Sequence, residues 1–85
     1  MAEWHWELFR DDTLEGLPHE AVTAVKQLME QITTRESMIF LDGASYTGDN
    51  PPSRTEATNP LMVNYLTDVR GERVVLIQVT WNGTG

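Results

Sequence analysis

The sequence contains no cysteine and is poor in basic residues. Without cysteine the chain has no disulfides and no thiolate nucleophiles or ligands, which excludes thiol redox chemistry and fits a reducing compartment. Six Lys and Arg stand against 13 Asp and Glu, for a net charge of −7. This excess of negative charge repels the phosphate backbone of DNA and RNA, so nucleic acid is not the expected partner.

Long hydrophobic runs are missing as well. No stretch approaches the roughly 20 apolar residues that a membrane span needs, and the N-terminus shows no signal-peptide pattern of basic and then apolar residues. We therefore expect a cytoplasmic protein without a membrane segment. With 85 residues, the chain is expected to fold as one domain over residues 1–85 around a single small core.

The first pattern that is present is the strand-like alternation in WHWELF. Three apolar residues share one face of this strand: Trp4, Trp6 and Leu8. Between them, His5 and Glu7 are expected to face outward. Because a terminal strand must be anchored, we expect the two tryptophans to pack against a helix while the strand joins the sheet that contains residues 74–81.

An amphipathic helix is predicted from about Pro18 to Ile32. Proline is tolerated at the first helical position, and Glu20 suits the positive end of the helix dipole. Apolar residues then recur at spacings of three and four: Ala21, Val22, Val25, Leu28, Met29 and Ile32. This face is expected to pack on the sheet.

The segment Arg35–Leu41 is ambiguous between helix and strand. Its apolar quartet Met38-Ile39-Phe40-Leu41 suits either a buried strand or the inner face of a helix. We favour a short second helix that is capped by Thr34 and stopped at Gly43. Core packing is the favoured role of the quartet, and a partner-binding patch is the alternative.

A long loop and a hairpin complete the chain. Residues 44–60 are rich in Gly, Pro and Asn, and a loop of this length is usually functional, partly disordered or hiding a short edge strand, here near residues 53–57. Residues 61–69 and 73–81 are rich in β-branched and aromatic residues and predict an antiparallel hairpin. One face of its second strand is expected to carry Val75, Ile77, Val79 and Trp81.

Together these patterns predict an α+β fold. It consists of an N-terminal strand, a helical hairpin of one long and one short helix, and an antiparallel β-meander, with the helices on one face of the sheet. The stretches WHWELF, GLPHEAVTAVKQLMEQ and NPLMVNYLTDVRGERVVLIQVTW resemble those of small actinobacterial RelE-like proteins of the RelE/ParE toxin superfamily. The resemblance covers most of the chain outside residues 35–59.

This resemblance implies a toxin that either cleaves mRNA on the ribosome or inhibits DNA gyrase, and that a cognate antitoxin neutralises. Nuclease members hold phosphate and move protons with Lys, Arg, His and Tyr, because cleavage by a 2′-hydroxyl needs an acid, a base and charge stabilisation. The basic and aromatic residues that usually follow the last strand are absent after Trp81. The weak catalytic candidates that remain are Arg54, Tyr65 and Arg73, with Arg70 nearby in sequence, and solvated surface arginines are the favoured interpretation.

No metal or cofactor site is expected. His5 and His19 lack metal-ligand spacing, and Asp42 and Asp49 lack the pattern of a calcium loop.

Three functions follow from the sequence. The first is a RelE-like toxin-family protein, catalytically weak or silent, that binds a peptide or antitoxin-like partner. The second is a small interaction module without toxin ancestry, and the third is a ribosome-dependent mRNA endoribonuclease. The negative charge disfavours the third.

Overall fold

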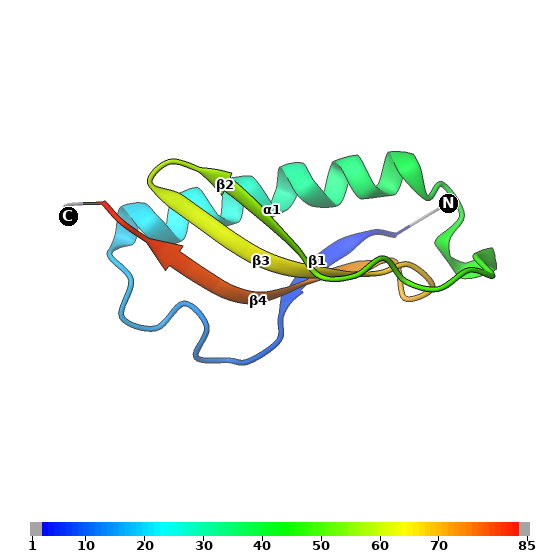
Figure 1. Cartoon of the computed structure of the whole chain (residues 1–85), viewed down its shortest axis with the longest axis horizontal. Coiled ribbons are helices and arrows are strands. Elements are labelled where there is room, and N and C mark those ends of the chain that lie inside the picture. Colours follow the sequence, from blue (N-terminus) through cyan, green and yellow to red (C-terminus); the bar gives the residue numbers. More distant parts are fainter. Residues whose placement is uncertain (1–2, 84–85) are drawn as a thin grey trace.

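The computed structural model describes residues 3–83, which form one long helix and a four-stranded sheet (Figure 1). In chain order the elements are β1 (His5–Leu8), α1 (His19–Ile39), the short 3₁₀ turn η1 (Gly43–Ser45), β2 (Arg54–Thr58), β3 (Leu61–Asp68) and β4 (Arg73–Trp81). The α+β class and the order of strand, helix and antiparallel strands are confirmed.

The strands lie in the order β1-β4-β3-β2, so β1 and β2 form the two edges of the sheet. The pairs β2–β3 and β3–β4 are antiparallel, and β1 runs parallel to β4. The long loop predicted for residues 44–60 contains β2, which confirms the short edge strand expected near residues 53–57. Figure 1 shows α1 extending along one face of the sheet.

The core lies between α1 and that face of the sheet. It combines helix and strand residues: Val25, Leu28, Met29 and Ile32 with Leu61, Val63, Tyr65, Val74 and Leu76. The helical members recur at the predicted spacings, and Pro18 occupies the N-cap, which confirms the predicted start of the helix. Within residues 3–83, no helix is both long enough and apolar enough to cross a membrane.

The predicted second helix is wrong, because α1 continues without a break to Ile39. Thr34 does not act as a cap, since it lies within the helix and its carbonyl accepts a hydrogen bond from Ser37 Oγ at 2.7 Å. Glu36 is fully buried and extends the inner face of the helix by one more turn. The helix ends where Phe40 N–H donates to the Glu36 carbonyl. Arg35–Ile39 is therefore helical, as the end of α1.

The predicted faces of β4 are also wrong, because a β-bulge reverses them midway. Asn64 pairs with Gln78 but Tyr65 pairs with Leu76, which leaves Ile77 as the extra residue. Before the bulge Val74 and Leu76 face α1, and after it Val79 and Trp81 pack against the same core. Alternation in sequence cannot predict such a reversal, because one inserted residue exchanges the two faces of a strand.

The N-terminal strand is anchored as predicted. β1 pairs with β4 from His5 opposite Arg73 to Leu8 opposite Leu76. Three half-buried side chains pack against the core from β1 and the residue before it: Trp4, Trp6 and Leu8. His5 is exposed and Glu7 lies on the opposite face of the sheet. The tryptophans therefore bind the chain terminus to the sheet.

We expect Trp6→Ala to lower the free energy of unfolding by about 2–4 kcal/mol, because it removes a large ring that contacts the core. His5→Ala should change it by less than about 0.5 kcal/mol, because the imidazole is exposed. Urea denaturation of both variants measures the difference. Equal free energies of unfolding for the two variants would show that the anchoring of β1 does not depend on the indole ring of Trp6.

Candidate functional site

Two of the three catalytic candidates lie together. Arg54, the first residue of β2, is paired in register with Tyr65 of β3. The guanidinium carbon of Arg54 lies 5.3 Å from the centroid of the Tyr65 ring, which is the geometry of a cation–π contact. The two residues are far apart in sequence, so the sequence alone does not predict this contact. It forms because the β2–β3 hairpin places the two residues opposite each other.

Arg54 is engaged by a carboxylate that the sequence did not single out. Its guanidinium binds Oε1 of Glu36, and Thr67 Oγ1 donates to the same oxygen at 2.7 Å. Glu36 is 0% exposed, and among the described residues its second oxygen has no hydrogen-bond partner. A buried carboxylate needs a nearby cation, so Arg54 acts as the counter-ion of Glu36.

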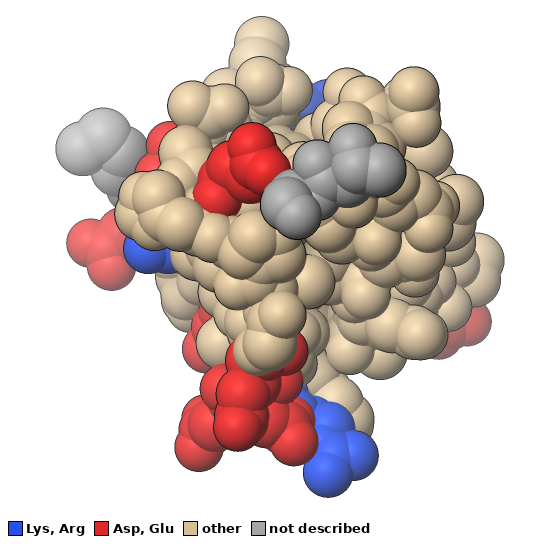
Figure 2. All heavy atoms as spheres, turned by 90° about the vertical axis from the view of Figure 1, so that its left-hand side faces the viewer, with Lys and Arg blue, Asp and Glu red and all other residues tan. Residues whose placement is uncertain are grey.

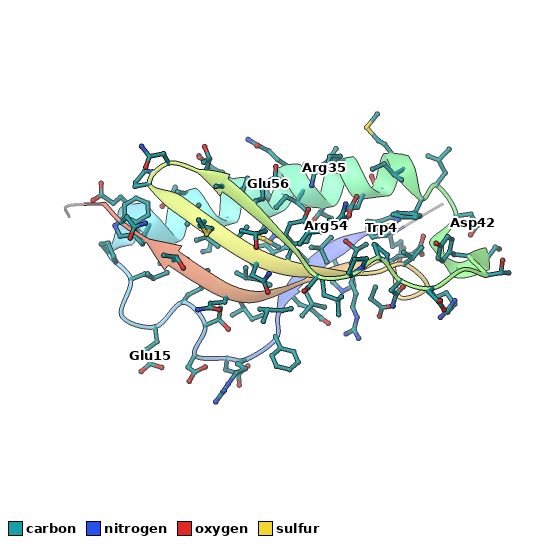
Figure 3. The ribbon with its side chains drawn as sticks, viewed as in Figure 1. Trp4, Glu15, Arg35, Asp42, Arg54 and Glu56 are labelled. Carbon is teal, nitrogen blue, oxygen red and sulfur yellow. The ribbon has the colours of Figure 1, made fainter. Side chains whose placement is uncertain are left out.

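A second ion pair lies beside the first. Arg35 of α1 donates to both carboxylate oxygens of Glu56 at 3.1 and 3.2 Å and to the Tyr65 hydroxyl at 2.8 Å. The hydrogen bond with Glu56 is the main cause of the raised pKa of Arg35. Figure 3 shows Arg35, Arg54 and Glu56 gathered between α1 and β2. We call this group the Arg–Glu network; its members are Arg35, Glu36, Arg54, Glu56, Tyr65 and Thr67.

Arg73, the third candidate, lies on the opposite face of the sheet. It binds Glu7 of β1, and its Nε donates to Asp68 Oδ2 at 2.8 Å. That hydrogen bond is the main cause of the raised pKa of Arg73 and of the lowered pKa of Asp68. The structure therefore does not bring Arg73 together with Arg54 and Tyr65. Arg70 is separate again, and binds the carbonyls of Tyr46 and Gly48 at 3.3 and 3.0 Å.

These arginines form no cationic pocket. In the Arg–Glu network two guanidinium groups are balanced by two carboxylates, and Arg73 is flanked by two more. A phosphate that bound there would have to displace a carboxylate that already makes charge-assisted hydrogen bonds. Across residues 3–83, no group of three or more His, Cys, Asp or Glu is placed to hold a metal ion.

The residues that sequence reasoning placed wrongly form an exposed apolar surface. Met38, Ile39 and Leu41 are 70%, 59% and 74% exposed, so the favoured expectation of core packing is wrong for them. The reason is helical phase: α1 runs on, and Met38 lies one turn beyond Thr34 on the outer face of the helix. We call these three residues the Met38–Leu41 surface. Phe40 is half-buried between them and stacks on Trp4, with ring centroids 6.4 Å apart.

A cluster of acidic side chains lies away from this apolar surface, towards the end of the molecule at which α1 begins. Figure 2 shows acidic side chains gathered at the lower end of that view, where the segment between β1 and α1 lies in Figure 1. The exposed acidic residues of that segment are Asp11, Asp12 and Glu15. This cluster is therefore separate from the Met38–Leu41 surface, and it contributes to the net charge of −7.

Comparisons with known proteins give no match. No family model matches the chain, and no curated protein or solved structure matches it either.

We expect Arg54→Ala to destabilise the protein by about 2–4 kcal/mol, because it leaves Glu36 buried without a counter-ion. Arg73→Ala is the matched control on the other face of the sheet. It should cost about 1 kcal/mol or less, because its ion pairs are open to water. Chemical denaturation at neutral pH compares the two variants. If Arg73→Ala lowered the free energy of unfolding more than Arg54→Ala does, the need of buried Glu36 for a counter-ion would be contradicted.

Proposed function

We propose that this chain is a RelE-like toxin-family protein without catalytic activity that acts by binding a protein partner. The single observation that carries the binding role is the Met38–Leu41 surface, where three large apolar side chains of one short segment are more than half exposed. Adjacent exposed apolar residues of this kind mark interaction sites. The family assignment is supported by the sequence resemblance and by the order of strand, helix and antiparallel strands.

The lack of activity is supported by the pairing of the candidate residues. A ribonuclease of this kind needs cations free to stabilise the developing negative charge on phosphate. Here Arg54 is the counter-ion of Glu36, and Tyr65 accepts a hydrogen bond from Arg35 through its hydroxyl. Arg73 is held by Glu7 and Asp68 on the other face of the sheet. The endoribonuclease alternative would require these groups to be released.

The partner is expected to be a peptide or an antitoxin-like protein that combines apolar side chains with positive charge. Its apolar residues would cover the Met38–Leu41 surface, and its basic residues would suit a chain of net charge −7. An interaction module without toxin ancestry would use the same surface. What separates the two is the genomic origin of the partner, because an antitoxin-like partner is expected from a short adjacent gene.

Binding can be tested by co-expressing the protein with the product of the adjacent gene and measuring the affinity of the complex. The double variant Met38→Gln/Ile39→Gln should weaken binding about 10- to 100-fold, because it removes two apolar anchors. Its stability should change by less than about 0.5 kcal/mol, because both side chains are largely exposed. Thr23→Gln, at an exposed position near the other end of α1, is the control and should bind normally. Unchanged affinity of the double variant would remove the Met38–Leu41 surface from the proposal.

Catalysis is tested separately with a labelled mRNA, with and without ribosomes. We expect the purified protein to leave the RNA intact at physiological salt, because its arginines are paired and its field is negative. Cleavage that Tyr65→Phe abolishes while the fold is retained would establish the endoribonuclease alternative. Tyr65→Phe keeps the ring and removes only the hydroxyl, so it separates chemistry from folding better than Arg54→Ala.

A further inference from the structure

The outer edge of β1 carries main-chain groups without partners. His5 and Phe9 donate their N–H groups to the carbonyls of Glu72 and Leu76, so the odd-numbered residues of this strand face β4. Because main-chain groups alternate along a strand, those of Trp6 and Leu8 point away from the sheet. Among the described residues, no hydrogen bond reaches them from outside the ladder. Such an edge is a template for another strand.

A hollow of about 400 Å³ lies beside this edge, between β1 and α1. Its lining combines aromatic and polar side chains: Trp4, His5, Trp6, Glu30, Thr33 and Thr34. Trp4 and Trp6 are half-buried, so each indole still presents apolar surface at the edge. A strand that paired with β1 would cover this surface together with the unpaired main-chain groups.

The sequence of the strand is complementary to itself. In an antiparallel pair of two such strands centred on Trp6, Trp6 faces Trp6 and Trp4 faces Leu8 of the second copy. On the other face of the strand, His5 lies opposite Glu7 of the second copy. The two side chains are already compatible within one chain, where His5 Nε2 lies 3.7 Å from Glu7 Oε2. We propose that two copies of this chain pair through β1 about a two-fold axis at Trp6, which joins their sheets into one.

Main-chain geometry and charge both select this register. Residues whose main-chain groups point outward must face one another, so only registers that pair Trp6 with Trp4, Trp6 or Leu8 form the ladder. Pairing Trp6 with Trp4 places Glu3 opposite Glu7, and pairing Trp6 with Leu8 places Glu7 opposite Glu7. Like charges directly opposite each other are unfavourable. Only the register centred on Trp6 avoids both contacts and supplies two His5–Glu7 pairs.

The dimer is weak because its contact is short. β1 has four residues, and a ladder of that length buries less than the roughly 1,200 Å² of a stable interface. Association is therefore expected to depend on concentration and to require a high protein concentration. It does not rest on the proposed function, since the Met38–Leu41 surface is not part of the β1 edge.

Disulfide trapping tests the register directly, because the chain has no cysteine of its own. Residues 5 and 7 of the two copies form a non-hydrogen-bonded pair, whose Cα atoms lie about 4.5 Å apart, within disulfide range. His5→Cys mixed with Glu7→Cys should therefore give a disulfide-linked dimer under mild oxidation. His5→Cys alone should cross-link at least about tenfold more slowly, because its two Cα atoms lie about 8 Å apart. A mixture of His5→Cys with Thr55→Cys, on the other edge of the sheet, is the control for random collision.

Sedimentation of the cysteine-free protein provides the second measurement. At about 1 mM the wild type should sediment partly as a dimer. His5→Glu should raise the dissociation constant about 3- to 30-fold by facing two carboxylates across the edge, and His5→Lys should lower it. The proposal is overturned if the wild type stays monomeric, or if the His5→Cys and Glu7→Cys mixture cross-links no faster than the controls.

Discussion

The pairing of Glu36 with Arg54 is the constraint on which the rest of the structure depends. A carboxylate removed from water costs several kcal/mol unless a cation and hydrogen bonds replace the solvent. Glu36 is fully buried, and Arg54 and Thr67 both contact it. Its stabilisation therefore requires three elements at once: the last turn of α1, the start of the edge strand β2, and the end of β3. Tyr65 adds to this by stacking under Arg54 and by binding Arg35.

The same pairing determines what the surface can do. Because Glu36 must face inward, helical phase directs Met38 outward two residues later. The cations near the candidate catalytic residues are used to balance buried or partly buried carboxylates, so little positive charge is left to attract phosphate. The exposed side chains at this end of the molecule are therefore apolar, and the net charge of the chain is negative. This combination is the reason for proposing a protein partner rather than a nucleic acid.

Sequence reasoning predicted the elements whose signal is local. WHWELF, the first two-thirds of α1 and the β3–β4 hairpin follow from periodicity, and the structure confirms them. Sequence reasoning failed where the local structure depends on a contact with a residue far along the chain. Residues 33–39 continue α1 because Glu36 finds Arg54, a partner 18 residues further along the chain. The bulge at Ile77 likewise has no local signal, and it exchanges the faces of β4.

The candidate site shows the same division. Arg54, Tyr65 and Arg73 were chosen by residue type, and residue type alone does not reveal which guanidinium is already paired. Whether a guanidinium group is paired depends on its acidic partners, and these partners come from α1, β1 and β3. A search for carboxylates at inward positions of predicted elements would have found Glu36, because it lies four residues after Ile32 on the apolar face of the helix.

Pairing through β1 would also change how the protein binds its partner. A two-fold axis perpendicular to a continuous antiparallel sheet leaves both copies of α1 on the same face of that sheet. The two Met38–Leu41 surfaces would then point to the same side, and one partner with two apolar segments could bind both. The second contact would be intramolecular, so the avidity could exceed the affinity of a single surface by about 10²–10⁴ when the linker between the segments spans the distance. A weak dimer and a weak apolar contact would thereby stabilise each other, because whatever binds the dimer more tightly than the monomer also favours the dimer.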